Sequence, residues 1–159
     1  MNYDEKMNMN YVEFGNMPPQ AFLLGLLSAF DNRYQAAADA FFKEITWKQF
    51  FAIICINLCK EPPTINELSE VMGSSHQNVK QILLKLEKKG FVAFVTDDSD
   101  RRKQRILVTD SCRAFLEEND NNGKQSQYII GRIFEGVDEK DLTATIQTIM
   151  RMERNLSEL

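Results

Sequence analysis

The amino-acid sequence predicts a mostly α-helical protein with one small β-hairpin. Apolar residues recur at helical spacing through most of the 159 residues, which predicts a series of amphipathic helices. Residues 91–96 and 105–108 are instead rich in β-branched and aromatic side chains and enclose a charged loop, a pattern typical of a hairpin. With 43% hydrophobic residues, the chain can form one domain with a core, alone or with a helical appendage.

Several functional classes are excluded by what the composition lacks. No apolar run reaches the roughly 18 to 20 residues of a membrane helix, and residues 1–15 are too polar and acidic for a signal peptide. We therefore expect a cytoplasmic protein with no membrane partner. Three cysteines, an odd number, argue against a disulfide framework. The single histidine and seven glycines form no two-histidine zinc motif, nucleophile elbow or phosphate-binding loop, so we expect no enzyme, cofactor or metal site.

The N-terminal part is predicted to contain an arm and two helices. Residues 1–17 lack periodicity and predict an extended arm. Pro18 and Pro19 favour a helix start, and apolar spacing predicts a helix over 20–43. The helix predicted over 46–59 is apolar on nearly all sides, so we expect it to be buried all round.

The central segment predicts two shorter helices joined by a tight turn. Thr64 and Glu67 have the spacing of a capping box, which starts the first helix, and Gly73 ends it. The second helix begins at Ser74-Ser75 and places four apolar residues at i, i+3, i+4 and i+7: Val79, Ile82, Leu83 and Leu86. Two lysines and Gly90 end this helix, directly before the predicted hairpin.

The C-terminal part predicts two further helices. The first runs from residue 111 to about 134 after a cap at Thr109 or Asp110, and its Asn-rich centre at 119–123 is expected to kink or interrupt it. Asp138 caps the last helix. Both ends of the chain thus carry helices with wide apolar faces, which favours pairing with a second copy. The alternative is that the two ends of one chain pack on each other.

Charge is distributed unevenly along the chain. The net charge is −4, but residues 76–105 carry eight Lys or Arg against four Asp or Glu, a local charge of +4 that leaves −8 elsewhere. Short helix, tight turn, helix and a hairpin with a basic tip is the order of a winged helix-turn-helix.

The outward face of the second of these helices carries Gln, Asn and Lys side chains, which suit base edges and phosphates. A merely solvated polar face is the alternative for this helix, but cations at a hairpin tip contribute nothing to a core. The predicted DNA contacts are Ser74, Ser75, His76, Gln77, Asn78, Lys80, Gln81, Lys85, Arg101, Arg102 and Lys103.

Four stretches of the sequence resemble the MarR (multiple antibiotic resistance regulator) family of transcription factors. They are residues 66–73, 79–92, 97–109 and 134–142. In the third stretch Asp100-x-Arg102 matches the D-x-R element of the family's wing, and the resemblance as a whole covers about residues 20–157. The sequence departs from the family at Cys112, where Gly is common, and at Leu84, which occupies a usually polar outward position.

The resemblance implies a homodimer in which the N-terminal helix and the two C-terminal helices pair across a two-fold axis. Residues 18–45 and 110–159 would then form the helical dimerisation region, and residues 46–109 the winged helix-turn-helix domain. The resemblance also implies that Asp100 orients the wing by steadying Arg102 through an ion pair, without touching DNA itself.

Eight of the 16 aromatic residues lie within residues 22–51. Because the family commonly binds small aromatic or anionic effectors between its dimerisation and DNA-binding parts, the resemblance implies a pocket there. Our candidates for its lining are Phe30, Tyr34, Phe51 and Cys55, with plain core packing as the alternative. The apolar surroundings of Cys55 predict an inert thiol rather than an oxidant sensor.

Together these observations predict a sequence-specific regulator of transcription that binds duplex DNA as a homodimer on a pseudo-palindromic operator. Release from the operator by a small effector would make it a repressor. A winged-helix protein-interaction module without DNA binding is the alternative, and the overall negative charge lends it some support.

Overall fold

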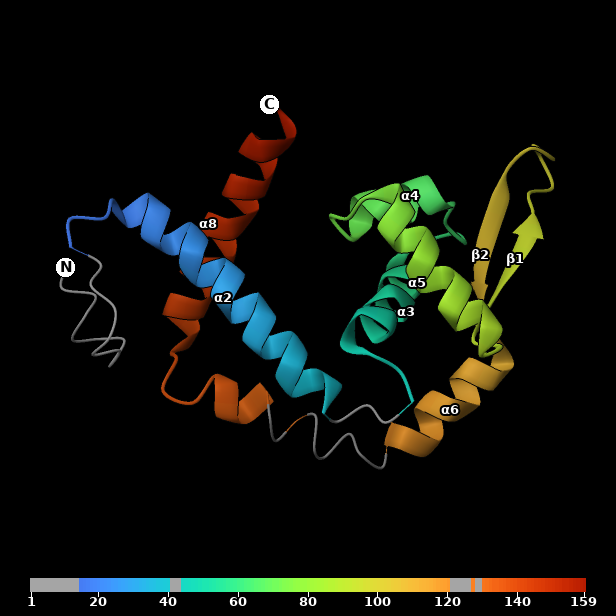
Figure 1. Cartoon of the computed structure of the whole chain (residues 1–159), viewed down its shortest axis with the longest axis horizontal. Helices are drawn as coiled ribbons and strands as arrows, with labels where there is room; N and C mark the ends of the chain where they lie inside the picture. The colour runs from blue at the N-terminus through green and yellow to red at the C-terminus, as the bar shows by residue number, and fades with distance from the viewer. Residues whose placement is uncertain (1–14, 41–43, 121–126, 128–129) are drawn as a thin grey trace. The chain divides into compact units, whose positions relative to one another are not determined.

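The computed structural model describes residues 15–40, 44–120, 127 and 130–159. Its helices and strands (Figure 1) are α2 (Pro19–Asp39), α3 (Trp47–Leu58), α4 (Ile65–Val71), α5 (His76–Lys88), β1 (Val92–Thr96), β2 (Gln104–Val108), α6 (Asp110–Asp120) and α8 (Glu139–Ser157). The prediction of a mostly helical chain with one antiparallel hairpin is confirmed. The arm predicted at 1–17 lies almost wholly outside the described residues.

The chain forms two compact units, residues 1–110 and 111–159. The first unit holds α2 to β2, and its centre is a small core where α3, α4, α5 and the hairpin meet. The core side chains are Ile45, Ala52, Ile53, Cys55, Ile56, Leu68, Val79, Ile82, Leu83, Leu86, Phe91, Val92, Ile106 and Val108. The four apolar positions predicted on one face of α5 are therefore all buried.

Capping residues begin the three helices of this core. Thr46 accepts a hydrogen bond from the Gln49 backbone, and the Gln49 side chain accepts one from Thr46, which makes a complete capping box at α3. The predicted capping box of Thr64 and Glu67 begins α4. Ser75 caps α5. These reciprocal bonds satisfy backbone N–H groups that have no partner inside the helix, which explains why the predicted boundaries agree so closely with the structure.

Two glycines end the two short helices. Gly73 follows α4 with a φ of 58°, and Gly90 follows α5 with a φ of 74°. Both values lie in the left-handed region, where a side chain is strained. The predicted glycine stop of α5 is confirmed, and it delivers the chain directly into β1.

The hairpin is bonded to the rest of the unit from the middle of β2 and from Thr109, the residue after β2. Val92 pairs with Val108, and Thr96 pairs with Gln104. The backbone N–H of Ile106 donates to the Pro63 carbonyl at 2.9 Å. Directly after β2, the Thr109 hydroxyl donates to the Gly90 carbonyl at 2.6 Å. The hairpin therefore stands beside α4 as part of the core (Figure 1).

Two expectations for the N-terminal helices are wrong. Residues 20–43 were expected to form one helix, but α2 ends at Asp39 and residue 40 lies in a turn; residues 41–43 lie outside the described residues. The Asp39 carboxylate accepts a hydrogen bond from the Trp47 backbone at the start of α3. The apolar α3 was expected to be buried all round, yet Leu58 is 74% exposed and Phe51 is half-buried. Within the described residues of the first unit, the neighbours of this helix do not cover every side of it.

The second unit contains nearly all of α6, helical residues 130–133 and α8. The predicted cap at Asp138 is confirmed, because its side chain accepts a hydrogen bond from the Asp141 backbone at 2.8 Å. Of the first predicted helix, 111 to about 134, the structure describes α6 to Asp120 and helical residues 127 and 130–133. Most of its Asn-rich centre at 119–123 lies outside the described residues.

Candidate nucleic-acid interface

The face of α5 opposite the core is free of contacts that would bury it. Val79, Leu83 and Leu86 point into the core with no exposed surface. The outward side chains are Gln77, Lys80, Gln81, Leu84 and Lys85, all exposed. Leu84, at 43% exposure, adds an apolar point to this otherwise polar face. The helix therefore offers hydrogen-bond donors and acceptors to a partner without disturbing its own packing.

Side chains at the start of α5 bond partly to one another. The Ser75 hydroxyl accepts from the Asn78 backbone at 3.3 Å, and the Asn78 side-chain nitrogen donates to the Ser74 hydroxyl at 2.8 Å. His76 and Gln77 are exposed beside them. Of the five residues predicted here as DNA contacts, Ser74, Ser75 and Asn78 thus also hold the turn together.

The hairpin of β1, β2 and the loop 97–103 between them, which we call the wing, presents Arg102 bonded to Asp100. Arg102 donates from Nε to Asp100 Oδ1 at 3.1 Å and from Nη2 to Asp100 Oδ2 at 3.3 Å. These bonds, with a third from the Arg102 backbone, lower the pKa of the Asp100 carboxyl. The Arg102 side chain nevertheless remains 91% exposed. A fork-shaped guanidinium held in this way reaches outward at a defined position.

A second polar cluster joins the wing to α4, and sequence reasoning missed it. We call it the Arg105 cluster: Arg105, Asp97, Glu67 and the Pro62 carbonyl. Arg105 Nε bonds to Asp97 Oδ2 at 2.5 Å, and its Nη1 lies 3.1 Å from Glu67 Oε2 and 3.1 Å from the Pro62 carbonyl. Arg105 is therefore engaged inside the protein, although it contributed to the local positive charge counted from the sequence.

Asp97 is buried at the centre of this cluster, with 8% of its surface exposed. Its carboxylate accepts hydrogen bonds from Ser99, from Arg105 and from the Asp100 backbone, which together hold the pKa of Asp97 far below its usual range. The spacing of Asp97 and Ser99 is typical of a side-chain-stabilised turn. That local signal was available in the sequence, whereas the bond to Arg105 depends on strand register.

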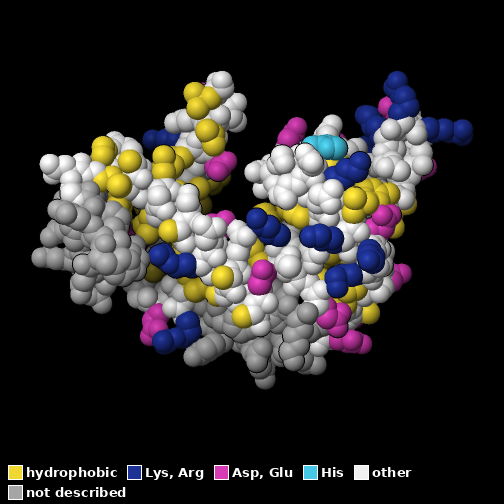
Figure 2. Space-filling model, in the orientation of Figure 1, with side chains coloured by type: hydrophobic (Ala, Val, Ile, Leu, Met, Phe, Trp, Pro, Cys, Tyr) yellow, Lys and Arg dark blue, Asp and Glu magenta, His cyan; other side chains and the backbone are white. Residues whose placement is uncertain are grey.

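A hollow of about 300 Å³ lies between the wing and the starts of α4 and α5. We call it the notch. Its lining residues are Thr64, Ile65, Asn66, His76, Arg102, Lys103 and Gln104. Figure 2 shows dark-blue Lys and Arg side chains at the hairpin tip, with the cyan histidine on the same unit. The cationic side chains suit an anion such as a phosphate. Sequence reasoning had not included Thr64, Asn66 and Gln104.

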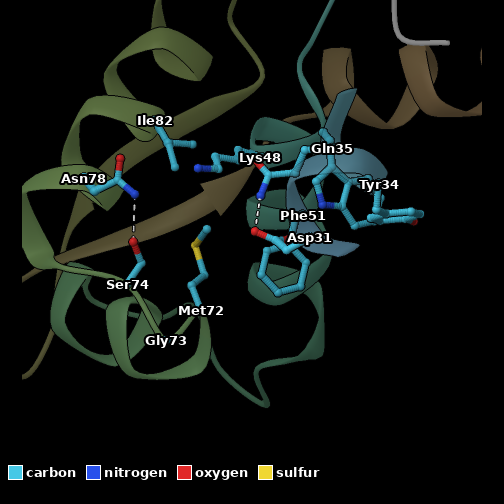
Figure 3. A pocket seen from close by; sticks show the side chains of 11 residues that line it. Asp31, Tyr34, Gln35, Lys48, Phe51, Met72, Gly73, Ser74, Asn78 and Ile82 are labelled. Carbon is cyan, nitrogen blue, oxygen red and sulfur yellow. Dashed lines mark hydrogen bonds between the residues drawn. The ribbon is translucent and has the colours of Figure 1, made fainter. Parts of the chain in front are cut away.

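A second hollow, of about 380 Å³, lies among α2, α3 and the turn before α5 (Figure 3). We call it the aromatic hollow. It is lined by Asp31, Tyr34, Gln35, Trp47, Lys48, Phe51, Met72, Gly73, Ser74, Asn78 and Ile82. Of the four residues predicted for an effector pocket, Tyr34 and Phe51 line it. Phe30 stacks on Tyr34 with 6.1 Å between ring centroids, and Cys55 is buried without reaching the hollow.

The walls of the aromatic hollow have two chemical characters. Trp47 meets Tyr34 edge-on at 4.8 Å and stacks on Phe51 at 6.1 Å between ring centroids. Partial burial raises the pKa of the Tyr34 phenol further above neutral pH. The ammonium of Lys48 and the bonded pair Ser74 and Asn78 supply polar groups on the other side. The hollow thus combines flat apolar surfaces with one cation, Lys48, and one carboxylate, Asp31, which accepts a hydrogen bond from the Gln35 side chain.

The cysteines and acidic residues offer no further chemistry in the described part of the chain. Burial raises the pKa of the Cys55 and Cys112 thiols, which keeps both in their less reactive form. Within the described ranges no group of three or more His, Cys, Asp or Glu is placed to hold a metal ion. Nor is any described helix long and apolar enough to cross a bilayer.

Comparison with known proteins gives the same fold at low sequence identity. Residues 45–103 match the model of the MarR family. A MarR protein from Peptoclostridium difficile is 18% identical, with a TM-score of 0.75 over 94% of this chain and 95% of that one. MepR of S. aureus, solved in complex with DNA, is 18% identical with a TM-score of 0.67, covering 82% and 95% of the two chains.

A third solved structure is informative because it holds a small molecule. CouR of Rhodococcus jostii, bound to p-coumaroyl-CoA, is 20% identical, with a TM-score of 0.68 over 80% of this chain and 89% of that one. At these identities the likeness is one of fold. The matched segment 45–103 contains α3, the helix-turn-helix, β1 and most of the wing.

Proposed function

We propose that this chain is a transcriptional regulator of the MarR type, which binds a pseudo-palindromic operator sequence-specifically as a homodimer. The match of residues 45–103 to the model of the MarR family supports this proposal. One observation carries the proposal: the exposed polar face of α5 and the basic wing belong to one well-packed unit. On this proposal the chain acts as a regulator rather than as an enzyme. Because such a regulator must be in the same compartment as the DNA, we propose that the protein is cytoplasmic.

The proposed contacts divide by chemistry. Gln77 and Gln81 face outward on α5, where a side-chain amide can form paired hydrogen bonds to an adenine edge in the major groove. Lys80 and Lys85 lie beside them and suit phosphates. Arg102, held by Asp100, would enter the minor groove or grip the backbone. Arg101, Lys103 and His76 would add contacts to the sugar-phosphate backbone.

The homodimer is supported by the apolar surface of the flanking helices. None of the residues of α2 or α8 is buried in the single chain. On α8, Ile146 is 50% exposed, Met150 66% and Leu156 64%, at positions that share one face of the helix. Apolar area of this kind is normally covered by a partner. A two-fold pair of winged units would match the symmetry of a pseudo-palindrome.

The aromatic hollow is our proposed effector site, and its occupant a small aromatic anion. Tyr34, Trp47 and Phe51 provide ring surfaces, and Lys48 provides the cation. The carboxylate of Asp31 also lines the hollow and is bonded to the Gln35 side chain. Ser74 and Asn78 line the hollow and also begin the proposed DNA-reading helix. A ligand that moved them would bias α5 between DNA-competent and released states, which is the behaviour of a repressor. CouR, with p-coumaroyl-CoA bound, shares the fold.

The DNA-binding proposal is tested by titrating the full chain into a labelled mixed-sequence duplex at low and high salt, then selecting tight sites from a random pool. We expect salt-sensitive binding to any duplex, since phosphate contacts release counterions, and recovery of a two-fold symmetric site. An absence of binding at low salt would overturn the proposal and favour a protein-interaction module.

The effector proposal needs a separate measurement. Salicylate and p-coumarate, used as probes, should raise the melting temperature of the chain and weaken its hold on the selected duplex by linkage. Lys48→Met should remove the response to the carboxylate while leaving DNA binding intact. A thermal shift that survives this substitution would place the ligand elsewhere.

A further inference from the structure

The Arg105 cluster adjoins the notch in sequence on two sides. Arg105 immediately follows the wing residues Arg102 to Gln104 that line the notch, and Glu67 immediately follows the lining residues Thr64 to Asn66 at the start of α4. Arg105 bonds to Glu67 and to the Pro62 carbonyl, so its guanidinium links the wing to α4. The backbone bond from Ile106 to Pro63 runs beside it.

The same guanidinium also controls the loop that carries the basic tip. Its partner Asp97 accepts hydrogen bonds from Ser99 and from the Asp100 backbone, and the Asp97 N–H donates to the Lys103 carbonyl at 3.0 Å. Asp100 in turn holds Arg102. One continuous chain of bonds therefore runs from α4 through Arg105 and Asp97 to the exposed arginine at the tip.

We propose that Arg105 is a positioning residue, which together with Asp97 and Glu67 holds the wing at a set distance from α4. It thereby determines where Arg102 and Lys103 meet the nucleic-acid backbone without touching DNA itself. The side chain of Arg105 is only 22% exposed and its donors are directed inward. The inference rests on the proposed DNA binding for its functional consequence, although the wing geometry can be tested without DNA.

The shape of arginine is what this role requires. A guanidinium carries five donors in a planar fork, so it can bond to a carboxylate on each side and to a carbonyl at once. A lysine ammonium has the same charge but is a single point on a flexible stem. Arg105→Lys therefore keeps the charge of the chain while removing the bridge, which separates a positioning role from a purely electrostatic one.

Glu67→Gln gives a test in which the two roles predict opposite signs. Glutamine can replace glutamate in a capping box. Gln49 is the corresponding residue of the capping box at the start of α3, so α4 should keep its cap. Removing a negative charge near DNA favours binding on electrostatic grounds alone. If the pair with Arg105 positions the wing, the same change should weaken binding instead.

Asp97→Asn and Asp98→Asn form a matched pair on adjacent residues. Both remove one negative charge from the wing, but Asp97 is buried in the cluster whereas Asp98 is exposed. Affinity of each full-length variant would be measured for a labelled mixed-sequence duplex. Wing order would be measured as the rate of tryptic cleavage after Arg101, Arg102 and Lys103, because proteolysis follows the population of opened chain.

We expect Arg105→Lys, Glu67→Gln and Asp97→Asn each to weaken duplex binding about fivefold and to speed wing cleavage by a similar factor, as suits the loss of a charge-assisted bond. Asp98→Asn should bind at least as tightly as the unaltered chain and be cleaved at its rate. Normal binding by Arg105→Lys and Glu67→Gln would overturn the inference. Weaker binding with unchanged wing cleavage would overturn it too.

Failure of the unaltered chain to bind any duplex would instead overturn the proposed function. The cleavage rates would then still decide whether Arg105 positions the wing. Circular dichroism melting of each variant shows that the rest of the unit is folded. If Arg105→Lys does not fold, Glu67→Gln, which keeps its cap, decides between the two roles.

Discussion

Two helices of similar amphipathic pattern end up in opposite surroundings. The 13-residue α5 buries all four of its apolar stripe residues, Val79, Ile82, Leu83 and Leu86. The 19-residue α8 has an equally regular stripe and buries none of it. The difference lies in the neighbours, since α3, α4 and β1 pack on α5 within the same unit. An apolar stripe specifies that a helix needs a partner, and only the fold supplies one.

The two helices also differ in which of their faces remains exposed, the polar face in α5 and the apolar face in α8. In the winged segment, residues 76–105 carry a local charge of +4 on a chain of net charge −4. The core there is complete, so polar side chains remain available for an outside partner. In α8 it is the apolar side that remains available. The first region is therefore expected to bind a polyanion, and the second to bind a copy of itself.

The largest expected effect is on the core. Leu83→Ala removes a fully buried side chain and should lower the free energy of unfolding by about 2 to 5 kcal/mol. Met150→Ala, on the exposed stripe of α8, should change it by less than about 0.5 kcal/mol in the dissociated monomer. Urea titration at low protein concentration measures both changes in the free energy of unfolding. Equal losses for the two variants would contradict the difference between α5 and α8.

Assembly should be the next most sensitive property. Ile146→Asp with Met150→Asp places two charges on the exposed stripe of α8 and should dissociate the dimer, since a buried unpaired charge is costly. Affinity for a selected symmetric duplex should fall at least about 100-fold because the two half-sites are no longer linked. Sedimentation velocity measures the first effect. Gln147→Glu, a polar position on the same helix, is the control and should remain dimeric.

Substitutions in the winged segment should distinguish residues that contact bases from residues that contact the DNA backbone. Gln81→Ala should cost about 1 to 3 kcal/mol on the selected duplex and leave mixed-sequence binding nearly unchanged. Arg102→Ala should weaken binding to every duplex and reduce the salt slope by about 1 per protomer. Asp100→Ala should give a milder form of the second result. An unaltered salt slope for Arg102→Ala would remove the wing from the DNA interface.

The smallest expected effect is a pH dependence of the wing. Hydrogen bonds from Ser99 and Arg105 lower the pKa of Asp97 in the folded state, so its stabilising contribution is present above the ordinary carboxyl pKa of about 3.9. That contribution is lost as pH falls below this value toward the lowered folded-state pKa. The difference in urea stability between the unaltered chain and Asp97→Asn should therefore shrink from about pH 7 to about pH 3.

Local signals account for the parts of the fold that were predicted correctly. The caps at Thr64, Ser75 and Asp138 were visible because a capping side chain acts within three residues of itself. The left-handed φ at Gly90 is equally local. The end of α2 was misjudged because Asp39 bonds to Trp47, eight residues away, which is beyond the reach of a local capping signal.

The sequence by itself determined the order of elements, the core face of α5 and the basic character of the hairpin, because spacing, capping and charge act over a few residues. Only the tertiary structure decided which cation points outward. Arg102 and Arg105 lie three residues apart with the same charge, yet one is 91% exposed and the other is bonded to Asp97, Glu67 and Pro62. The register of the two strands and the position of α4 beside them decide which arginine is bonded inside the protein. Neither can be predicted from the few residues around each arginine.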